Sequence, residues 1–279
     1  MVKTAKSKPP VVMLVGAGSM GGAMLRSWIE ANVIAKNSII VDPALTPEMK
    51  AFSGDFGLSV YGHSNDIPPG SEADILIYAV KPQIAGDVLP DFEQFAKNSV
   101  NVSIMAGKSI DAIKELLGGP EKIVRVMPNL PASIGEGMSG AYATDAVSLS
   151  DRASIEILLK ASGKNIWVKN EEGIDFVTAI SGSGPAYFFL LTEAITEAGI
   201  DLGLEPNVAQ TLARQTAIGA GALMVQDERS AAELRRAITS PGGTTDAALK
   251  VLDEGGAGLR LLILEAARMA AKRAKELSE

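Results

Sequence analysis

The sequence predicts an α/β fold, in which a doubly wound parallel sheet is followed by an all-helical C-terminal domain. As far as Val168, short apolar segments alternate with helical patterns, which is typical of a parallel sheet with helices on both faces. From Gly173 onward the pattern is helical to the end of the chain, with no convincing strand. We therefore expect two domains, residues 1–168 and residues 169–279.

The strands of the sheet are expected at apolar segments separated by turn residues. In chain order they are Val11–Val15, Ser38–Val41, Leu58–Tyr61, Ala73–Val80, Val100–Met105, Ile123–Met127, Gly140–Ala143 and Asn165–Val168. Unbroken apolar strands are expected where helices cover both faces of a sheet. The helices that provide this cover are expected near Met20–Ala31, Thr46–Phe52, Ser109–Leu117 and Asp151–Ser162.

The second half predicts helices at Pro185–Gly199, Pro206–Val225, Ala231–Thr239, Thr245–Asp253 and Leu259–Leu277. Pro206 suits a first helical turn, and Ser230 with Glu233 has the spacing of a capping box. The segment Asn207–Val225 is apolar or small nearly all round its circumference. We expect such a helix to be buried, and in so small a domain a second subunit could bury it, which predicts a homodimer through the helical half.

Composition excludes several classes of protein. The net charge of −7 provides no general basic field for nucleic acid. The absence of cysteine excludes disulfides, thiolate catalysis and cysteine-based zinc sites, and it fits a reducing cytoplasm. The only histidine, His63, lies beside a turn and is expected at the surface, which argues against a Ser-His-Asp hydrolase. We expect no metal, no secretory signal and no membrane span.

The stretch Gly16-Ala17-Gly18-Ser19-Met20-Gly21 follows an apolar strand and opens a helix, which is the context of a dinucleotide-binding G-x-G-x-x-G motif. Gly16 would allow the tight turn, Gly18 would leave room for a phosphate, and Gly21 would let the helix pack on the strand. Free N–H groups at the helix start, including those of Ser19 and Met20, would face the pyrophosphate. The alternative is an ordinary glycine-rich loop.

Other cofactor contacts are expected where strands end. Asp42 stands 21 positions after Gly21, where an acidic side chain commonly accepts hydrogen bonds from the adenosine ribose; it would repel a 2′-phosphate and so favour NADH. The alternative is that Asp42 simply opens a turn with Pro43. Asn65 could reach the adenosine half of the cofactor. The rim of the sheet would also offer Ala79, Val80, Lys81 and Pro82, which end the fourth strand, and Asn129 at the end of a later one. Lys81 could equally be a solvated lysine.

Two glycine-rich stretches interrupt the helical half, Ser181-Gly182-Ser183-Gly184-Pro185 and Ser240-Pro241-Gly242-Gly243-Thr244-Thr245. Each precedes a helix, which is the arrangement of an anion-binding turn, and a substrate carboxylate is the obvious small anion. The alternative is a pair of capped helix starts with glycine linkers.

Five stretches in chain order resemble those of the pyrroline-5-carboxylate reductases. They are the Gly16–Gly21 motif, Ala79-Val80-Lys81-Pro82, Met127-Pro128-Asn129, the stretch from Ser181 and the stretch from Ser240. The resemblance covers the chain from Val11 to the last helix. It implies a Rossmann-type N-terminal domain and an all-α C-terminal dimerisation domain that forms an interlocked homodimer, sometimes a larger ring of dimers. It also implies the last step of proline synthesis, in which NAD(P)H reduces the C=N bond of the cyclic imine 1-pyrroline-5-carboxylate.

By the same resemblance, Ser240, Gly242, Gly243 and Thr244 would hold the substrate carboxylate. Thr245 would hydrogen-bond the ring nitrogen, and Glu228 matches an acidic position close to the active site of the family. The chain departs from many relatives at Leu130, where they have threonine, and at Asp42, where they have a small or neutral polar residue. Asp42 therefore favours NADH without excluding NADPH.

Two other functions remain open at this point. A related 3-hydroxyacid dehydrogenase would need a lysine on the helical domain, and no lysine lies between Gly173 and Leu249. A non-catalytic dinucleotide sensor would bind the cofactor without turnover of an imine, and the intact turn at 240–245 argues against it.

Overall fold

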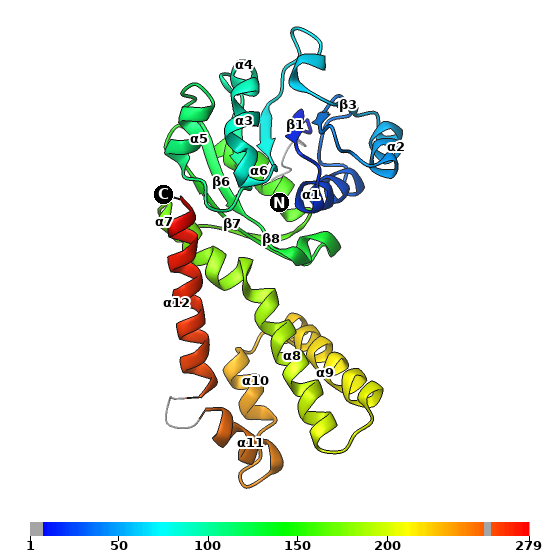
Figure 1. The fold of residues 1–279 in the computed structure, drawn as a ribbon, viewed down its shortest axis with the longest axis vertical. Coiled ribbons are helices and arrows are strands. Elements are labelled where there is room, and N and C mark those ends of the chain that lie inside the picture. Colours follow the sequence, from blue (N-terminus) through cyan, green and yellow to red (C-terminus); the bar gives the residue numbers. More distant parts are fainter. Residues whose placement is uncertain (1–7, 254–257, 279) are drawn as a thin grey trace, which may run out of the picture. The chain divides into compact units, whose positions relative to one another are not determined.

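The computed structural model describes residues 8–253 and 258–278, and these residues form two compact units (Figure 1). One unit comprises the chain up to Gly182 together with the segment from Ala270 onward. The other is Ser183–Met269. The sheet predicted for the first half lies wholly within the first unit, and its last strand ends at Trp167.

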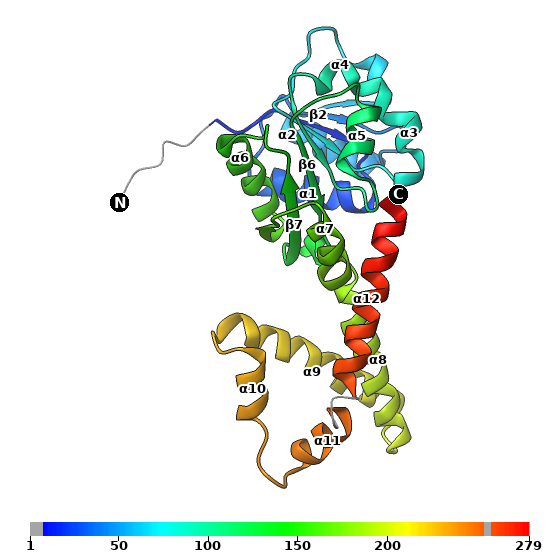
Figure 2. The same ribbon diagram turned by 90° about the vertical axis from the view of Figure 1, so that its left-hand side faces the viewer.

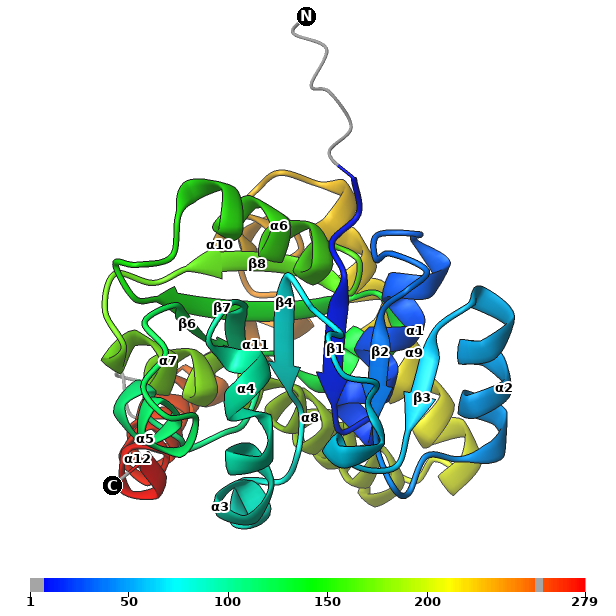
Figure 3. The ribbon, with the colours of Figure 1, turned by 90° about the horizontal axis from the view of Figure 1, so that it is seen from above.

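The sheet has eight strands in the order β3-β2-β1-β4-β5-β6-β7-β8 (Figure 3). Their bounds are β1 Val12–Val15, β2 Ile39–Val41, β3 Ser59–Tyr61, β4 Ile75–Tyr78, β5 Val100–Ser103, β6 Ile123–Met127, β7 Gly137–Ala143 and β8 Gly163–Trp167. Every expected strand is present, so the doubly wound sheet is confirmed.

The expectation of an entirely parallel sheet is wrong at one edge. β7 runs antiparallel to β6, and β8 is parallel to β7. The reason is the connection from β6 to β7, which consists only of residues 128–136 with the short 3₁₀ turn η4 (Leu130–Ile134). A parallel crossover needs about a dozen residues or more, usually with a helix, so this short link can only turn the chain back.

Helices cover both faces of the sheet (Figure 2). α1 (Ser19–Glu30) and α6 (Leu149–Lys160) share one apolar core with alternate residues of the strands, and α3 (Ala85–Val88) and α5 (Ile110–Leu116) share the other. Unit 1 also contains α2 (Pro47–Phe56), α4 (Glu93–Ala96), α7 (Glu172–Val177) and the 3₁₀ turns η1 (Ser64–Asp66), η2 (Pro82–Ile84) and η3 (Leu89–Phe92). Consecutive residues of a strand point to opposite faces of the sheet, and helices cover both faces. Side chains on both faces must therefore be apolar, which explains the unbroken apolar strands.

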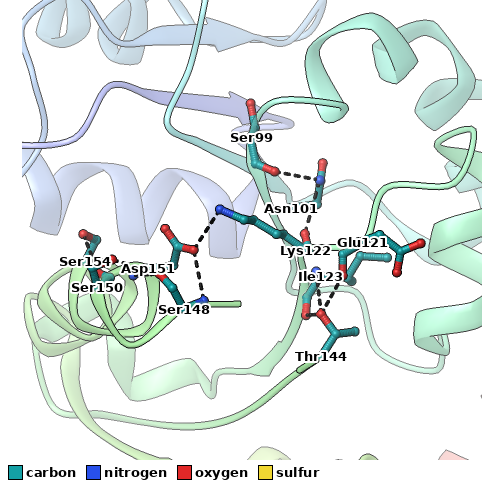
Figure 4. Close-up of polar contacts among 10 residues, drawn as sticks. All are labelled: Ser99, Asn101, Glu121, Lys122, Ile123, Thr144, Ser148, Ser150, Asp151 and Ser154. Carbon is teal, nitrogen blue, oxygen red and sulfur yellow. Dashed lines mark hydrogen bonds and ion pairs between the residues drawn. The ribbon is translucent and has the colours of Figure 1, made fainter. Parts of the chain in front are cut away.

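A polar network occupies the edge of the sheet where strands begin (Figure 4). The buried Asn101 donates through its amide to the carbonyl oxygen of Ser99 at 3.1 Å, and Lys122 forms an ion pair with Asp151 at 3.1 Å. Burial alone would raise the pKa of Asp151, but hydrogen bonds with Ser148 and Lys122 outweigh it and hold the pKa below its usual value. These bonds fix the start of α6 to the start of β6.

The first of the two glycine-rich stretches is not the loop that the sequence predicts. Thr178–Gly182 forms a π-helical turn, η5, between α7 and α8 (Gly184–Asp201), so Ser181 and Gly182 are part of a helical turn. Anion binding by this stretch stays a prediction. Gly182 packs closely on β6, because a Cβ would lie 2.7 Å from Cε of Met127, at the flexible end of that side chain.

Among the residues of unit 2 that the structure describes, all regular elements are helices, as expected. They are α8, α9 (Pro206–Gln226), α10 (Ala231–Ala237), α11 (Thr244–Leu252) and the first part of α12 (Leu259–Ser278). Pro206 occupies the first turn of α9, and Ser230 and Glu233 form the capping box of α10, both as predicted. α8 and α9 approach closely, since a Cβ on Gly199 would lie 3.0 Å from Cβ of Ala209.

The apolar surface of α8 and α9 is largely exposed in a single chain. Only Ala209 and Ala213 of α9 are buried within one chain, so burial of the rest of this helix by a second subunit stays a prediction. The exposed apolar side chains include Phe188, Phe189, Leu190, Leu212, Ile218 and Leu223. By length and composition the run Glu172–Asp201 could also cross a membrane, a test that helices of soluble proteins pass too. A second copy of the chain is the occupant that the sequence predicts for this surface.

Candidate functional site

The carboxyl ends of four parallel strands meet at one edge of the sheet. Val15 at the end of β1 pairs with Val41 and with Tyr78, and Val41 pairs with Tyr61. The residues that follow these four strands therefore lie at a common edge. The chain order reverses between β1 and β4, and ligands of open α/β sheets bind at such a switch point.

The glycine loop after β1 has the geometry of a phosphate cradle. Gly16 has φ of +86°, which other residues rarely adopt, and a Cβ there would lie 3.0 Å from the backbone of Ala79. A Cβ on Gly21 would overlap the carbonyl oxygen of Gly16 and lie 2.8 Å from Cβ of Ala79. Around Gly18, by contrast, no atom lies within 4 Å of the position of a Cβ. Two of the glycines are therefore needed for packing, and the third faces open space.

The start of α1 leaves backbone donors available. Gly18 is the N-cap, no side chain caps the helix, and its first turn contains no acidic residue. The first helical bond is donated by Gly22 to the carbonyl oxygen of Gly18 at 2.7 Å, so the amides of Ser19, Met20 and Gly21 precede the helical ladder. Unpaired donors, a positive dipole end and the open space at Gly18 together fit a dinucleotide pyrophosphate.

Asp42 directly follows β2 at this edge, and its carboxylate bonds two backbone amides. Oδ2 accepts the N–H of Ala17 at 2.6 Å, and Oδ1 accepts the N–H of Ala44 at 2.7 Å. The turn-opening interpretation of Asp42 is therefore confirmed by geometry, and the ribose contact stays a prediction. Asn65 is exposed in η1, at the same edge.

The residues after β4 differ in their surroundings. Ala79 and Val80 pack against Gly16, Pro82 opens η2, and Lys81 is exposed. Lys81 is thus accessible to a ligand at the switch point, and no contact defines its role further.

Asn129 is only 9% exposed, and its side chain is engaged within the protein. Its amide donates to the carbonyl oxygen of Ser181 at 3.1 Å, and its Oδ1 accepts the N–H of Met138 at 2.8 Å. Asn129 therefore joins β7 to the π-helical turn. A contact of this side chain with the cofactor would have to be made alongside these bonds.

In unit 2, the turn at Ser240–Gly243 leads directly into α11. Gly242 has φ of +75°, Gly243 is the N-cap, and Thr244 and Thr245 form the first turn of the helix. The N–H of Gly243 is bonded to the carbonyl oxygen of Ser240 at 3.0 Å. This stretch is therefore a loop at a helix start, as the sequence predicts. The amides of Thr244 and Thr245 precede the first helical bond, from Ala247 to Gly243, and together with the hydroxyls they are suited to a carboxylate.

Asp246 is a member of this turn that the sequence analysis missed. Its carboxylate accepts the N–H of Gly242 at 3.1 Å and pairs with Lys250 at 2.9 Å. The hydrogen bond from Lys250, followed by that from Gly242, lowers the pKa of Asp246. The signal for it was an acidic residue in the first turn of a helix, where N-terminal carboxylates are favoured.

Glu228 lies in the link between α9 and α10 and is exposed. The residues on either side of it bond each other, since Arg229 donates to both carboxylate oxygens of Asp227 through Nε at 3.0 Å and through Nη2 at 2.6 Å. This bonding lowers the pKa of Asp227 to about 2. The link is thus held in shape around Glu228 without using the side chain of Glu228.

A buried cation in the sheet was also missed. Arg125 of β6 is 4% exposed and donates through Nη1 to Glu171 at 2.6 Å, and its Nη2 lies 3.8 Å from Asp175. Glu171 also accepts the N–H of Ile110 at 2.8 Å, so the cluster joins β6, α5 and α7. Burial raises the pKa of Asp175; Glu171 and Glu172 add to the rise, and Arg125 and Lys275 oppose it. The signal was an arginine within the apolar strand Ile123–Met127.

Comparison with known proteins gives consistent results for both units. The family described as "Pyrroline-5-carboxylate reductase dimerisation" matches residues 171–277, and the family "NADP oxidoreductase coenzyme F420-dependent" matches residues 11–107. A pyrroline-5-carboxylate reductase of Pseudomonas aeruginosa is 38% identical, over 97% of this chain and 97% of its own length. One of Arabidopsis thaliana is 34% identical, over 96% of this chain and 95% of its own length.

Solved structures agree. A pyrroline-5-carboxylate reductase of Coxiella burnetii has a TM-score of 0.87 at 33% identity, covering 98% of this chain and all of its own. The Plasmodium falciparum pyrroline carboxylate reductase, solved with NADP bound, has a TM-score of 0.80 at 28% identity, covering 97% of this chain and 98% of its own. The resemblance inferred from the motifs is confirmed, the C-terminal match supports a homodimer, and the N-terminal match supports an NAD(P)-dependent oxidoreductase. The chain belongs to the pyrroline-5-carboxylate reductase family.

Proposed function

We propose that this chain reduces 1-pyrroline-5-carboxylate to L-proline with NAD(P)H, the final step of proline biosynthesis. The observation that carries the proposal is the combination of an open phosphate cradle at Gly18 with a glycine turn at the start of α11. The curated relatives and solved structures bearing this enzyme's name cover nearly the whole chain.

In this proposal the turn before α11 binds the substrate carboxylate through Ser240, Gly242, Gly243 and Thr244. A helix start offers free amides and a positive dipole end to such an anion. The Thr245 hydroxyl hydrogen-bonds the ring nitrogen and holds its proton in position, and Glu228 lies close to the same site. A protonated imine is already electrophilic, so these residues need only bind and orient it, and bound NAD(P)H supplies the hydride.

The cofactor lies at the switch point between β1 and β4. The amides of Gly18, Ser19, Met20 and Gly21 hold the pyrophosphate, and Gly16 provides the turn that brings them to it. Asn65 contacts the adenosine half, and Ala79–Pro82 and Asn129 line the nicotinamide side. The Asp42 carboxylate favours NADH over NADPH, because its charge would repel a 2′-phosphate.

Beyond the homodimer, we propose that dimers could assemble into a larger ring, with the exposed apolar faces of α8 and α9 forming the dimer contact. We place the enzyme in the cytoplasm as a soluble protein without nucleic-acid or membrane partners. The absence of cysteine and the net charge of −7 support this placement.

The test is to mix the purified protein with 1-pyrroline-5-carboxylate and to follow oxidation of NADH and NADPH in parallel. Turnover is expected with both, and a higher kcat/KM with NADH would support the role of Asp42. Binding of a coenzyme without turnover would favour a dinucleotide sensor or a 3-hydroxyacid-type dehydrogenase instead.

A second measurement tests Thr245. Thr245→Ala should lower kcat by about 10²-fold, the low end for a proton-transfer group, and leave coenzyme affinity unchanged. Thr245→Ser keeps the hydroxyl and should retain most of the activity. Equal activity of the alanine variant would remove Thr245 from the mechanism.

A further inference from the structure

Two consecutive amides of the glycine loop are fastened to the end of β2. The N–H of Gly16 donates to the carbonyl oxygen of Val41 at 2.9 Å, which continues the pairing of β1 with β2. The next amide, that of Ala17, donates to Oδ2 of Asp42 at 2.6 Å. Beyond Ala17 the surroundings change, because Gly18 faces open space. The loop thus has a bonded first half and an open second half.

Asp42 makes this bond from a fixed position. Its other oxygen, Oδ1, accepts the N–H of Ala44 at 2.7 Å, so the carboxylate is held from both sides by backbone. Both bonds are charge-assisted, and both have the short length expected of such bonds. Each oxygen can accept one further hydrogen bond, so a ribose contact is compatible with the arrangement.

From this geometry we infer that Asp42 is a positioning residue for the dinucleotide loop, in addition to any contact with the ribose. By holding the Ala17 amide against β2, it fixes where the following amides of Gly18 to Gly21 present themselves to a pyrophosphate. Asp42 therefore sets the affinity for NADH and NADPH alike, while its charge sets the ratio between them. The inference rests on the proposed binding of NAD(P)H at this loop.

A carboxylate is the side chain that this role requires. Both backbone groups are N–H donors, and they approach two different oxygens. Asparagine has a single acceptor oxygen, so its NH₂ group would face one of the two amides, donor against donor. Glutamate keeps both acceptors and the charge, but its extra methylene displaces them from the two amides.

The loop role and the charge role predict opposite results for one coenzyme. If Asp42 acted only by repelling a 2′-phosphate, Asp42→Asn would bind NADPH more tightly than the unchanged protein does. If it also positions the loop, the loss of one charge-assisted bond weakens coenzyme binding on the order of tenfold, which offsets the tighter NADPH binding that loss of the charge alone would give. The dissociation constant for NADH rises further, since the ribose contact is lost as well.

The experiment measures dissociation constants of NADH and NADPH by coenzyme fluorescence for the full-length protein and for Asp42→Asn and Asp42→Glu. The glutamate variant retains the charge, so weaker binding of both coenzymes to it isolates the positioning role. Asp55→Asn is the matched control, because Asp55 is an exposed acid on the helix that follows β2, and its removal changes net charge equally. Thermal unfolding of each variant checks that it is folded.

Unchanged binding of both coenzymes in Asp42→Glu overturns the inference, because this variant keeps the charge and changes only the position of the carboxylate. The measurement does not depend on reduction of an imine. A protein that binds both coenzymes but does not turn over 1-pyrroline-5-carboxylate would refute the proposed reaction and leave the role of Asp42 intact. A protein that binds neither coenzyme would refute both.

Discussion

Replacing either of two glycines in the same loop by alanine should separate folding from coenzyme binding. At Gly21 a Cβ would overlap the carbonyl oxygen of Gly16 and lie 2.8 Å from Cβ of Ala79, so backbone must shift. Overpacking of this kind costs about 1–3 kcal/mol. At Gly18 the backbone has φ of −67° and nothing lies within 4 Å of a Cβ, so alanine fits without strain. Alanine has fewer backbone conformations than glycine in the unfolded chain, so Gly18→Ala should raise the free energy of unfolding slightly, by up to about 1 kcal/mol.

Coenzyme affinity should fall in both variants, for different reasons. In Gly18→Ala the methyl group occupies the space proposed for the pyrophosphate, and a loss of tenfold or more, about 1.4 kcal/mol, is expected in NADH binding. In Gly21→Ala the loss of affinity should accompany a lower free energy of unfolding in urea. Gly54→Ala in α2, which also has open space around it, serves as a control that should leave binding unchanged. If Gly18→Ala binds NADH as tightly as the unchanged protein, the pyrophosphate does not lie over Gly18.

Three further predictions concern charged groups. Arg125→Met should lower the free energy of unfolding by about 3 kcal/mol, because it leaves Glu171 and Asp175 without their cation; an unchanged urea midpoint would contradict this. Burial raises the pKa of Asp175 in the folded protein above its usual value, so the protonated carboxyl adds to stability at low pH. This added stability is lost as the pH rises from the usual pKa of an aspartate through the raised pKa of Asp175. Asp175→Asn should therefore reduce the gain in stability on acidification, measured between pH 7 and pH 4, and an identical pH profile would exclude this role. Asp246→Asn should lower the KM for 1-pyrroline-5-carboxylate about two- to threefold, because it removes a negative charge beside the proposed carboxylate turn. Lys250→Gln removes a positive charge there and should raise the KM. Steady-state kinetics would refute this if neither substitution changed the KM.

The sequence predicts the elements of this fold well, because their local signals are strong. Apolar strands, the capping box at Ser230 and the proline at Pro206 are all encoded in neighbouring residues. The direction of β7 is not encoded in its own pattern, since an apolar strand reads the same in either direction. The direction of β7 is set by the shortness of the link between β6 and β7. The length of that link can be judged only once the first residue of β7 is known.

The sequence predicted the parts of the candidate site that depend on local backbone shape. It missed the residues whose role depends on pairing with side chains far away in the sequence. The glycine spacing at Gly16, Gly18 and Gly21 is a local property, and the structure gives each glycine the surroundings expected of it. The bonds of Arg125 with Glu171, 46 positions away, could not be read from spacing. The stretch at Ser181 was expected to be a loop because serine and glycine favour turns, whereas Ser181 and Gly182 lie in the π-helical turn η5.

Each of the two proposed anion-binding turns also gives an amide to an aspartate of the chain itself. Gly242 donates to Asp246, and Ala17 donates to Asp42. The negative charge of Asp246 is paired with Lys250 at 2.9 Å. Asp42, by contrast, has no ion-pair partner among the residues that the structure describes. An internal carboxylate holds a turn in its binding shape at the cost of repelling an incoming anion. At the turn proposed for the substrate, Lys250 offsets this repulsion, so a substrate carboxylate should be tolerated there. At the coenzyme loop nothing described offsets it, so an additional phosphate on the ribose should be disfavoured, which is the physical basis for expecting NADH to be preferred.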